Sequence, residues 1–280
     1  MVIGKLRSEL RRELGENAHE ADWIITHVTG LTQSDFVLRP REVTDDELRE
    51  IRGLVNRRLD GEPLQYILGE TEFMGLRFKV TGETLIPRAD TETLAEEVIE
   101  KIGNRKRRVL DIGTGSGCIG ISIAKMCKNA EVTLLDYSDA ILDVASENAE
   151  LNGVSVKTVK CDILEEIPEG KYDIIVSNPP YIETETIFGL DNIVTSYEPI
   201  EALDGGFDGL MFYRRIAEIA GKLFDGSGFI AFEIGYNQGE AVTELLKDED
   251  FSSVRLKKDA CGNDRVVTAK LRQGVFERGD

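Results

Sequence analysis

The chain has 280 residues, of which 41% are hydrophobic and 31% charged, and its formal net charge is −18. This length allows one large domain or two, and the acidic charge disfavours nucleic acid as the main substrate, because gripping a phosphate backbone generally needs a basic face. No stretch approaches the roughly 20 apolar residues that span a bilayer, and the amino terminus has no signal-peptide core, so we expect a cytoplasmic protein without a membrane partner.

Cysteine and histidine usage narrows the chemistry further. The four cysteines are widely spaced and form no CxxC pair, which favours reduced thiols over disulfides or a zinc site. With only two histidines, both in an amino-terminal segment of helical pattern, a His-based triad or His-rich metal centre is not expected.

The first 60 or so residues have the pattern of a small helical bundle. Leu6, Leu10 and Leu14 recur every four residues and share one helical face. The four residues from Thr44 to Glu47 have the form of a capping box, and apolar residues at helical spacing follow them.

The stretch from Gln65 to Val80 has a different residue pattern. Its apolar residues alternate with turns marked by Gly69 and Gly75, and this pattern predicts a β-hairpin between two domains. We therefore expect a helical domain over residues 1–64, a hairpin and connector over 65–88, and a second domain over 89–280.

The second domain alternates strands with helices, which indicates βαβ units and a parallel sheet, and thus an α/β fold. The expected strands are Arg108–Asp111, Glu131–Asp136, Val156–Cys161, Tyr172–Ser177 and Gly228–Ile234. The expected helices cover about Thr91–Ile102, Gly117–Cys127, Ala140–Leu151 and Gly209–Leu223. Ser253–Leu256 and Arg265–Leu271 add two strands, interpreted as a hairpin at the edge of a seven-stranded sheet.

A glycine-rich turn follows the first of these strands. Gly113, Gly115 and Gly117 have GxGxG spacing, which differs from the GxGxxG of dinucleotide binders and from a phosphate loop. Glycines at this place let the backbone approach a ligand at the carboxyl end of the strand. Asp111, just before the turn, would repel a pyrophosphate and attract a cationic amino or sulfonium group.

Two further acids end the next two strands. Asp136 stands where an acid commonly accepts hydrogen bonds from a ribose diol, and Asp162 is placed to receive the amino group of an adenine. Each acid alone is an ordinary polar strand end. Together with Asp111 and the glycine turn, they predict a site for a nucleoside that carries a positive charge and no phosphates.

The fourth strand runs into a rigid polar turn, Asn178-Pro179-Pro180-Tyr181. Both prolines lack an N–H and have a fixed φ, so they allow neither helix nor further strand pairing. Asn178 is held extended by the proline that follows it. Taken alone, the turn can be interpreted in two ways: as a structural Pro-Pro turn, or as a set of fixed hydrogen-bond acceptors at the ligand-binding edge of the sheet.

These motifs carry a family resemblance. The order of Asp111 with the glycine turn, Asp136, Asp162 and the Asn178–Tyr181 turn resembles the class I methyltransferases that use S-adenosylmethionine. Within that class the chain resembles the bacterial release factor glutamine methyltransferases, called HemK or PrmC, over nearly its whole length. The further matching segments are Gln65–Gly69, Ile86–Arg88 with Thr91-Glu92, Tyr197–Pro199, Leu203–Leu210, Phe232–Gly235 and Gly262–Arg265. One departure is Ala89-Asp90, where the family usually has Pro-Glu.

The resemblance implies a fold and an activity. The fold is a Rossmann-like seven-stranded methyltransferase domain with a small helical amino-terminal domain joined by a β-hairpin. The activity is methyl transfer from S-adenosylmethionine to the N5 nitrogen of the glutamine in the Gly-Gly-Gln loop of peptide chain release factors. Release factors are then the partners, docked by the helical domain, and no stable nucleic-acid binding is expected.

The resemblance also assigns site residues. Substrate binding falls to Asn178, Pro179, Pro180 and Tyr181, of which Asn178, Pro179 and Tyr181 are catalytic. Cofactor binding falls to Asp111, Ile112, Gly113, Thr114, Gly115, Asp136, Asp162, Ile163 and Asn178. Arg88, Glu92, Glu198 and Glu233 lie in matched segments without an assigned role.

The chemistry of the turn leaves the target open. The Asn178 side-chain oxygen and the Pro179 carbonyl are two acceptors for the protons of a planar, conjugated NH₂ group, with Tyr181 packed against its plane. The same turn occurs in methyltransferases that act on DNA adenine and on RNA amines. The turn therefore indicates a conjugated amine, and the acidic charge and the matches outside the turn favour a protein glutamine.

Overall fold

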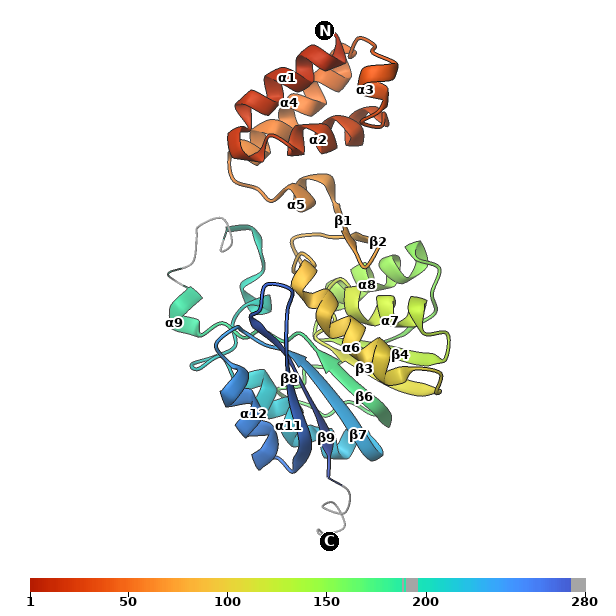
Figure 1. The fold of residues 1–280 in the computed structure, drawn as a ribbon, viewed down its shortest axis with the longest axis vertical. Helices are drawn as coiled ribbons and strands as arrows, with labels where there is room; N and C mark the ends of the chain where they lie inside the picture. Colours follow the sequence, from red (N-terminus) through yellow and green to blue (C-terminus); the bar gives the residue numbers. More distant parts are fainter. Residues whose placement is uncertain (188, 190–195, 273–280) are drawn as a thin grey trace. The chain divides into compact units, whose positions relative to one another are not determined.

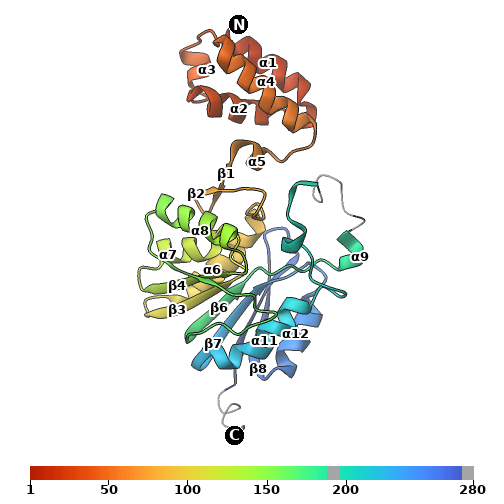
Figure 2. The ribbon, with the colours of Figure 1, turned by 180° about the vertical axis from the view of Figure 1, so that it is seen from behind.

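The computed structural model describes residues 1–187, 189 and 196–272. The chain divides into two compact units, one from Met1 to Glu70 and one that begins at Thr71 (Figures 1 and 2). Within the described ranges no helix is long and apolar enough to cross a membrane. The last eight residues of the expected second domain lie outside the described residues.

The first unit is a bundle of short helices, as the leucine pattern predicts. Its core gathers the apolar faces of these helices, including the fully buried Leu6 and Leu10. The capping box is confirmed: the Thr44 hydroxyl accepts from Glu47 N at 3.2 Å, and the Glu47 carboxylate accepts from Thr44 N at 2.9 Å. The helices are α1 Ile3–Glu13, η1 Gly15–Asn17, α2 Glu20–Thr29, α3 Asp35–Leu38, α4 Asp45–Leu59 and α5 Leu64–Leu68.

The prediction of strand structure from Gln65 is wrong at its start, because residues 64–68 form α5. Leu64 and Ile67 lie three residues apart on one face of this helix and are both buried. Gly69, with φ of 73°, ends the helix in the left-handed conformation. A run of apolar residues this short fits a strand and a buried helical turn equally well.

The hairpin itself follows α5, with strands β1 Glu70–Phe73 and β2 Leu76–Lys79. Its two turn residues, Met74 and Gly75, both have positive φ, as a two-residue type I′ turn requires. Glu92 accepts a hydrogen bond from Met74 N at 2.7 Å, which assigns this glutamate a structural role at the turn.

The described residues of the second unit form a seven-stranded sheet in the order β5-β4-β3-β6-β7-β9-β8. The strands from β3 to β7 pair in parallel, and β9 is antiparallel to both β7 and β8. This confirms the predicted α/β fold with an antiparallel edge hairpin. The strand bounds are β3 Arg107–Ile112, β4 Ala130–Asp136, β5 Lys157–Lys160, β6 Tyr172–Ser177, β7 Phe224–Glu233, β8 Phe251–Lys258 and β9 Asp264–Leu271.

Helices cover both faces of the sheet (Figures 1 and 2). One core lies between the sheet and α6 Glu92–Ile102, α7 Cys118–Met126 and α8 Asp139–Leu151, and includes Phe73 and Phe78 of the hairpin. The other lies under α11 Met211–Leu223 and α12 Gly239–Asp248. The helix α12 was not among the predicted elements. The described residues of this unit also include the single turns η2 Ala89–Thr91, α9 Thr184–Ile187 and η3 Ile200–Ala202.

The strand order fixes where a ligand can bind. The chain moves outward from β3 to β4 and β5, then returns to place β6 on the other side of β3. Open α/β sheets bind ligands outside the carboxyl ends of their strands at such a reversal. The ends of β3, β4 and β6 therefore mark the site.

Candidate active site

The glycine turn leads from β3 into α7 at this edge. Gly113, Gly115 and Gly117 have φ of 68°, 54° and 81°, a conformation that favours glycine. The main-chain N–H groups of Gly113 and Thr114 both donate to Leu135 O, at 2.9 and 3.0 Å, which fixes the turn against the end of β4.

Asp111 lies behind this turn, and its side chain is fully buried. Its Oδ2 accepts from the Thr114 hydroxyl at 2.7 Å and from Gly120 N at 2.9 Å. Its Oδ1 has no hydrogen-bond partner among the described residues. Burial raises the pKa of Asp111 to about 7, against the lowering effect of the two hydrogen bonds. The carboxyl thus braces the turn and is absent from the residues that line the cavity described below.

Asp136, at the end of β4, is buried and lines the cavity. Its two oxygens accept from Gly115 N at 3.0 Å and from Tyr137 N at 2.9 Å, so it connects the glycine turn to the end of β4. Burial raises its pKa. Asp162, which follows β5, is exposed and accepts from Leu164 N at 3.0 Å, while the neighbouring Ile163 is buried. Asp162 and Ile163 both line the cavity.

The Asn178–Tyr181 turn follows β6 directly, as predicted. Ser177, the last residue of β6, is fully buried and donates its hydroxyl to Ile112 O at 2.7 Å, which joins the end of β6 to the end of β3. Asn178, Pro179 and Pro180 line the cavity, whereas Tyr181 packs against the core under α11.

A second loop supports this turn from behind. A Cβ at Gly205 would lie 2.7 Å from Tyr181 Cα, and one at Gly209 would lie 2.4 Å from Tyr181 O. The buried carboxamide of Gln238 donates to Tyr181 O at 3.0 Å and to Gly209 O at 3.2 Å. The close approach explains why the Leu203–Leu210 segment needs its glycines.

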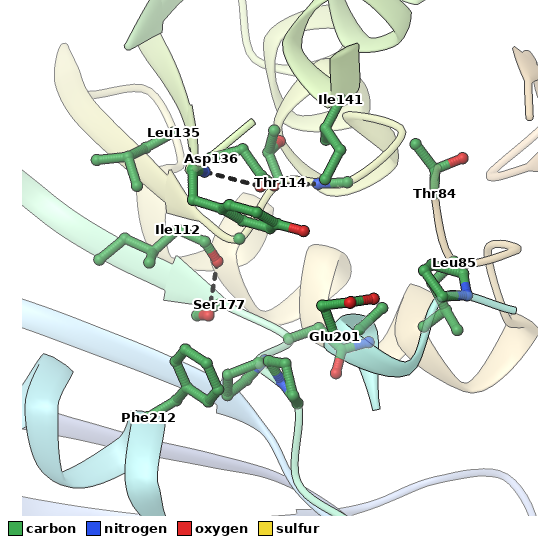
Figure 3. A pocket seen from close by; sticks show the side chains of 18 of the residues that line it. Thr84, Leu85, Ile112, Thr114, Leu135, Asp136, Ile141, Ser177, Glu201 and Phe212 are labelled. Atoms are coloured by element: carbon green, nitrogen blue, oxygen red, sulfur yellow. Dashed lines mark hydrogen bonds between the residues drawn. The ribbon is translucent and has the colours of Figure 1, made fainter. Parts of the chain in front are cut away.

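These elements enclose a cavity of about 380 Å³, within the roughly 300–1,000 Å³ that is usual for small-molecule sites. Figure 3 shows Ile112, Leu135 and Asp136 at the strand ends, with Thr84 and Leu85 of the connector across the space. Its walls are largely apolar. The aliphatic and aromatic side chains that provide them include Ile112, Ile119, Leu135, Ile141, Ile163 and Phe212.

Acidic side chains give the cavity a negative field. Tyr137 lines the cavity, and its pKa is raised by burial and by the charges of four acids: Glu201, Asp136, Glu83 and Asp162. The acids are thus close enough to act on one hydroxyl. Such a field favours a ligand that carries a positive charge and opposes one with phosphates.

Several lining residues were missed by sequence reasoning. Tyr137 directly follows Asp136, so its place after a strand was a usable signal. Thr84 and Leu85 belong to a connector without regular structure, and Phe212 reaches the cavity from α11. Gln238, just before α12, does not line the cavity but supports the turn from behind. Nothing in their local sequence marks them.

Arg88 and Glu198, which had no assigned role, form an ion pair in which the Glu198 side chain is buried. Arg88 also lines the cavity. Asp90, where the chain departs from the family pattern, lies 3.2 Å from the Arg265 guanidinium and forms an ion pair with it. Glu233 is buried beside Asn178.

The fold and this cavity together define a class I S-adenosylmethionine-dependent methyltransferase. The apolar walls suit an adenine, the strand-end acid Asp136 suits a ribose, and the negative field suits a sulfonium, so the residues present fit this cofactor. Residues 89–194 match the Methyltransferase small domain family. A methyltransferase structure from Pyrococcus furiosus shares the fold, with a TM-score of 0.52 and 21% identity over 80% of this chain and 98% of that one.

The chain belongs to the release factor glutamine methyltransferase family. Residues 2–69 match the PrmC N-terminal domain. The release factor glutamine methyltransferase of Thermodesulfovibrio yellowstonii is 38% identical over 95% of this chain and 96% of its own length. That of Geobacter sulfurreducens is 39% identical over 96% and 95%.

Proposed function

We propose that this enzyme methylates the N5 side-chain nitrogen of the glutamine in the Gly-Gly-Gln motif of peptide chain release factors. The observation that carries the proposal is the position of the Asn178–Tyr181 turn, which follows β6 and borders the cavity that fits the methyl donor. Full-length similarity to proteins named release factor glutamine methyltransferase supports this substrate over other conjugated amines.

In this proposal the cofactor site comprises Ile112 to Gly115, Asp136, Asp162 and Ile163, with Asp111 bracing the glycine turn from behind. When bound, S-adenosylmethionine supplies an electrophilic methyl group on a positively charged sulfur. The acids around Tyr137 favour that charge, and the apolar walls exclude water from the reacting atoms.

The substrate poses a specific difficulty, because an amide nitrogen shares its lone pair with the carbonyl and is a poor nucleophile. We assign the Asn178 side-chain oxygen and the Pro179 carbonyl as acceptors for the two amide protons. The two prolines hold both acceptors on a stiff backbone, so the nitrogen lone pair is aimed at the methyl group. Orientation of this kind contributes up to roughly 7–11 kcal/mol in favourable cases.

The same two hydrogen bonds also favour the transition state. Positive charge develops on the nitrogen as the new bond forms, so hydrogen bonds from its protons become stronger at that point than in the bound substrate. Tyr181 does not line the cavity, so in this proposal it holds the end of the turn by packing against the core under α11. No general base is needed before transfer. As the N–C bond forms, the S–CH₃ bond breaks and S-adenosylhomocysteine leaves, and one of the two amide protons is lost to solvent afterwards.

The helical unit over residues 1–70 is the proposed docking element for the release factor. It matches the PrmC N-terminal domain, and its helices bury a core of their own. Release factors act on ribosomes in the cytoplasm, so the proposal places the enzyme there.

A competition assay tests the proposal. Labelled S-adenosylmethionine is offered with release factor, with the release factor whose loop glutamine is changed to alanine, and with double-stranded DNA. The expected result is label on the unmodified release factor alone. Label on DNA and none on release factor would favour an amino-methyltransferase of nucleic acid, which the negative field of the cavity opposes.

A further inference from the structure

The buried carboxyl of Glu233 lies beside the proposed catalytic turn, and the register of the sheet explains why. Ser177 of β6 pairs with Phe232 of β7 in a parallel arrangement. The next residue on each strand is Asn178 and Glu233, so the two side chains point to the same face of the sheet. That face is the one covered by α6, since Val176 and Ala231, two residues earlier, pack in its core.

The Asn178 carboxamide is held by two groups on this face. Its Nδ2 donates to the Thr91 hydroxyl at 3.4 Å. Glu233 is the second group: the register of β6 and β7 places its carboxyl beside Asn178, and the nearby Thr91 and Asn178 side chains lower its pKa. An amide nitrogen has two protons, so with one donated to Thr91 the other is available to the neighbouring Glu233 carboxylate. The Asn178 oxygen is left as the acceptor for a ligand in the cavity that Asn178 lines.

Glu233 is an unusual residue to find in this position. Glu233 is only 2% exposed, and its Oε2 has no hydrogen-bond partner within the described part of the chain. A buried carboxylate with an unsatisfied oxygen costs stability, and such groups often persist at functional sites. The methyl-transfer chemistry derived above makes no use of it.

We propose that Glu233 is a positioning residue, which fixes the Asn178 amide with its nitrogen toward Thr91 and Glu233 and its oxygen toward the substrate. The inference rests on the proposed function, because it concerns the same turn. If the amide were turned over, its NH₂ group would face the substrate NH₂ and the hydrogen bond would be lost. The carboxylate can only accept, so it excludes the turned-over state.

The ionisation of Glu233 makes the proposal measurable. Burial raises the pKa of Glu233 to about 7; Asp90 raises it further, and the Thr91 and Asn178 side chains and Arg265 lower it. Above this pH the carboxylate accepts from Asn178. Below it the carboxyl can donate, and a donor tolerates the wrong amide orientation. The other titratable groups that feel the charge of Glu233 are Cys118, Tyr181, Tyr213 and Arg265.

The test compares three proteins: the wild type, Glu233→Gln, and Tyr213→Phe as a matched control. Tyr213 donates its hydroxyl to the main-chain oxygen of Glu233 at 2.9 Å, so its loss loosens the same strand end but leaves the carboxyl in place. For each protein, kcat at saturating substrates is measured against pH, together with the KM for both substrates and calorimetric S-adenosylmethionine binding.

The wild type is expected to lose kcat as pH falls through about 7. Glu233→Gln is expected to lose roughly tenfold or more in kcat at about pH 8, with little change in either KM, and to show no further acid loss attributable to this group. In Tyr213→Phe, kcat should still fall as pH drops through about 7. The proposal would be overturned if Glu233→Gln kept the kcat of the wild type and its fall below about pH 7. It would also be overturned if kcat fell in both variants in proportion to a loss of S-adenosylmethionine affinity.

Asp111 has a similar pKa, but it acts at the glycine turn, so its titration should appear in cofactor binding and persist in Glu233→Gln. A second readout does not depend on turnover. The Asn178 side-chain amide signal in an ¹⁵N spectrum should shift with pH around 7 in the wild type and not in Glu233→Gln. A wild type that fails to methylate release factor would contradict the proposed function, whereas an amide signal insensitive to pH would contradict this inference alone.

Discussion

The Gln238 side chain donates a hydrogen bond to the main-chain oxygen of Tyr181 at 3.0 Å and thereby holds the end of the Asn178–Tyr181 turn. The same carboxamide donates to Gly209 O at 3.2 Å and accepts from Gly235 N at 2.9 Å. One buried side chain therefore connects three loops: the turn after β6, the glycine loop before α11 and the segment after β7. The stiffness of the turn comes from this support as well as from its two prolines.

We predict that Gln238→Leu lowers kcat by roughly 10²-fold while cofactor affinity changes little, because the variant loosens the turn and not the glycine loop at β3. Stability should fall by about 1–3 kcal/mol, since three main-chain groups lose a buried partner. Steady-state kinetics, cofactor titration and urea unfolding measure these effects. A Gln238→Leu enzyme with normal turnover would show that the prolines alone hold the turn.

Gly209 provides a sharper test of the same support. We predict that Gly209→Ala lowers kcat far more than Gly226→Ala, although both glycines have positive φ, 69° and 80°. A Cβ at Gly209 would lie 2.4 Å from Tyr181 O, whereas one at Gly226 meets nothing within 4 Å. Both variants carry the backbone penalty of about 1 kcal/mol, and the difference in kcat and Tm between them reports the contact with the turn. Equal effects in the two variants would contradict this account.

The buried carboxyl of Asp111 should make the free energy of unfolding depend on pH. Its pKa is raised by burial from 3.8 to about 7 in the folded protein, so the charged form opposes folding. This cost is absent below the unfolded-state pKa, grows as pH rises and is complete above about 7. Asp111→Asn should therefore be more stable than the wild type at about pH 8, by on the order of 4 kcal/mol at about 1.4 kcal/mol per pKa unit.

The advantage of Asp111→Asn should shrink as pH falls from about 7 toward 3.8. Thermal unfolding of the two proteins across this range measures it. The variant should also bind S-adenosylmethionine more weakly, because the carboxylate braces the glycine turn. A stability difference that does not vary with pH would mean that Asp111 is not the buried charge described here.

The strand–helix alternation and the strand ends were predictable from sequence, because apolar patterns and glycine turns are local features. Asp136, Asp162 and Asn178 all border the cavity for this reason: each ends or follows a strand, and parallel strands end at one edge. The strand prediction fails at Tyr66–Leu68 because three or four apolar residues fit a strand and a helical turn alike. Here Leu64 and Leu68 pack against the core of the amino-terminal unit, which favours the helix.

The support behind the site was not predictable in the same way. Gln238 reaches Tyr181 only because α12 begins where it does, and Glu233 meets Asn178 only through the register of β6 and β7. Both contacts join residues more than 50 positions apart in the chain. Such pairings come from the topology of the sheet, and no short motif contains them.

Asn178 is the residue whose removal should separate chemistry from cofactor binding. We predict that Asn178→Ala binds S-adenosylmethionine with nearly unchanged affinity but loses roughly 10²–10³-fold in kcat, since one of the two acceptors for the substrate amide is gone. Calorimetric titration and single-turnover kinetics provide the two values. Near-normal turnover in this variant would remove Asn178 from the catalytic role proposed for it.

The proposed substrate is one glutamine of a release factor. The most direct measurement is mass spectrometry of release factor after reaction with the enzyme and S-adenosylmethionine, with fragmentation to locate the modification. The account predicts one added methyl group, on the side chain of the Gly-Gly-Gln glutamine, and none when that glutamine is changed to alanine. A release factor that remains unmodified, or that carries its methyl group on another residue, would contradict it.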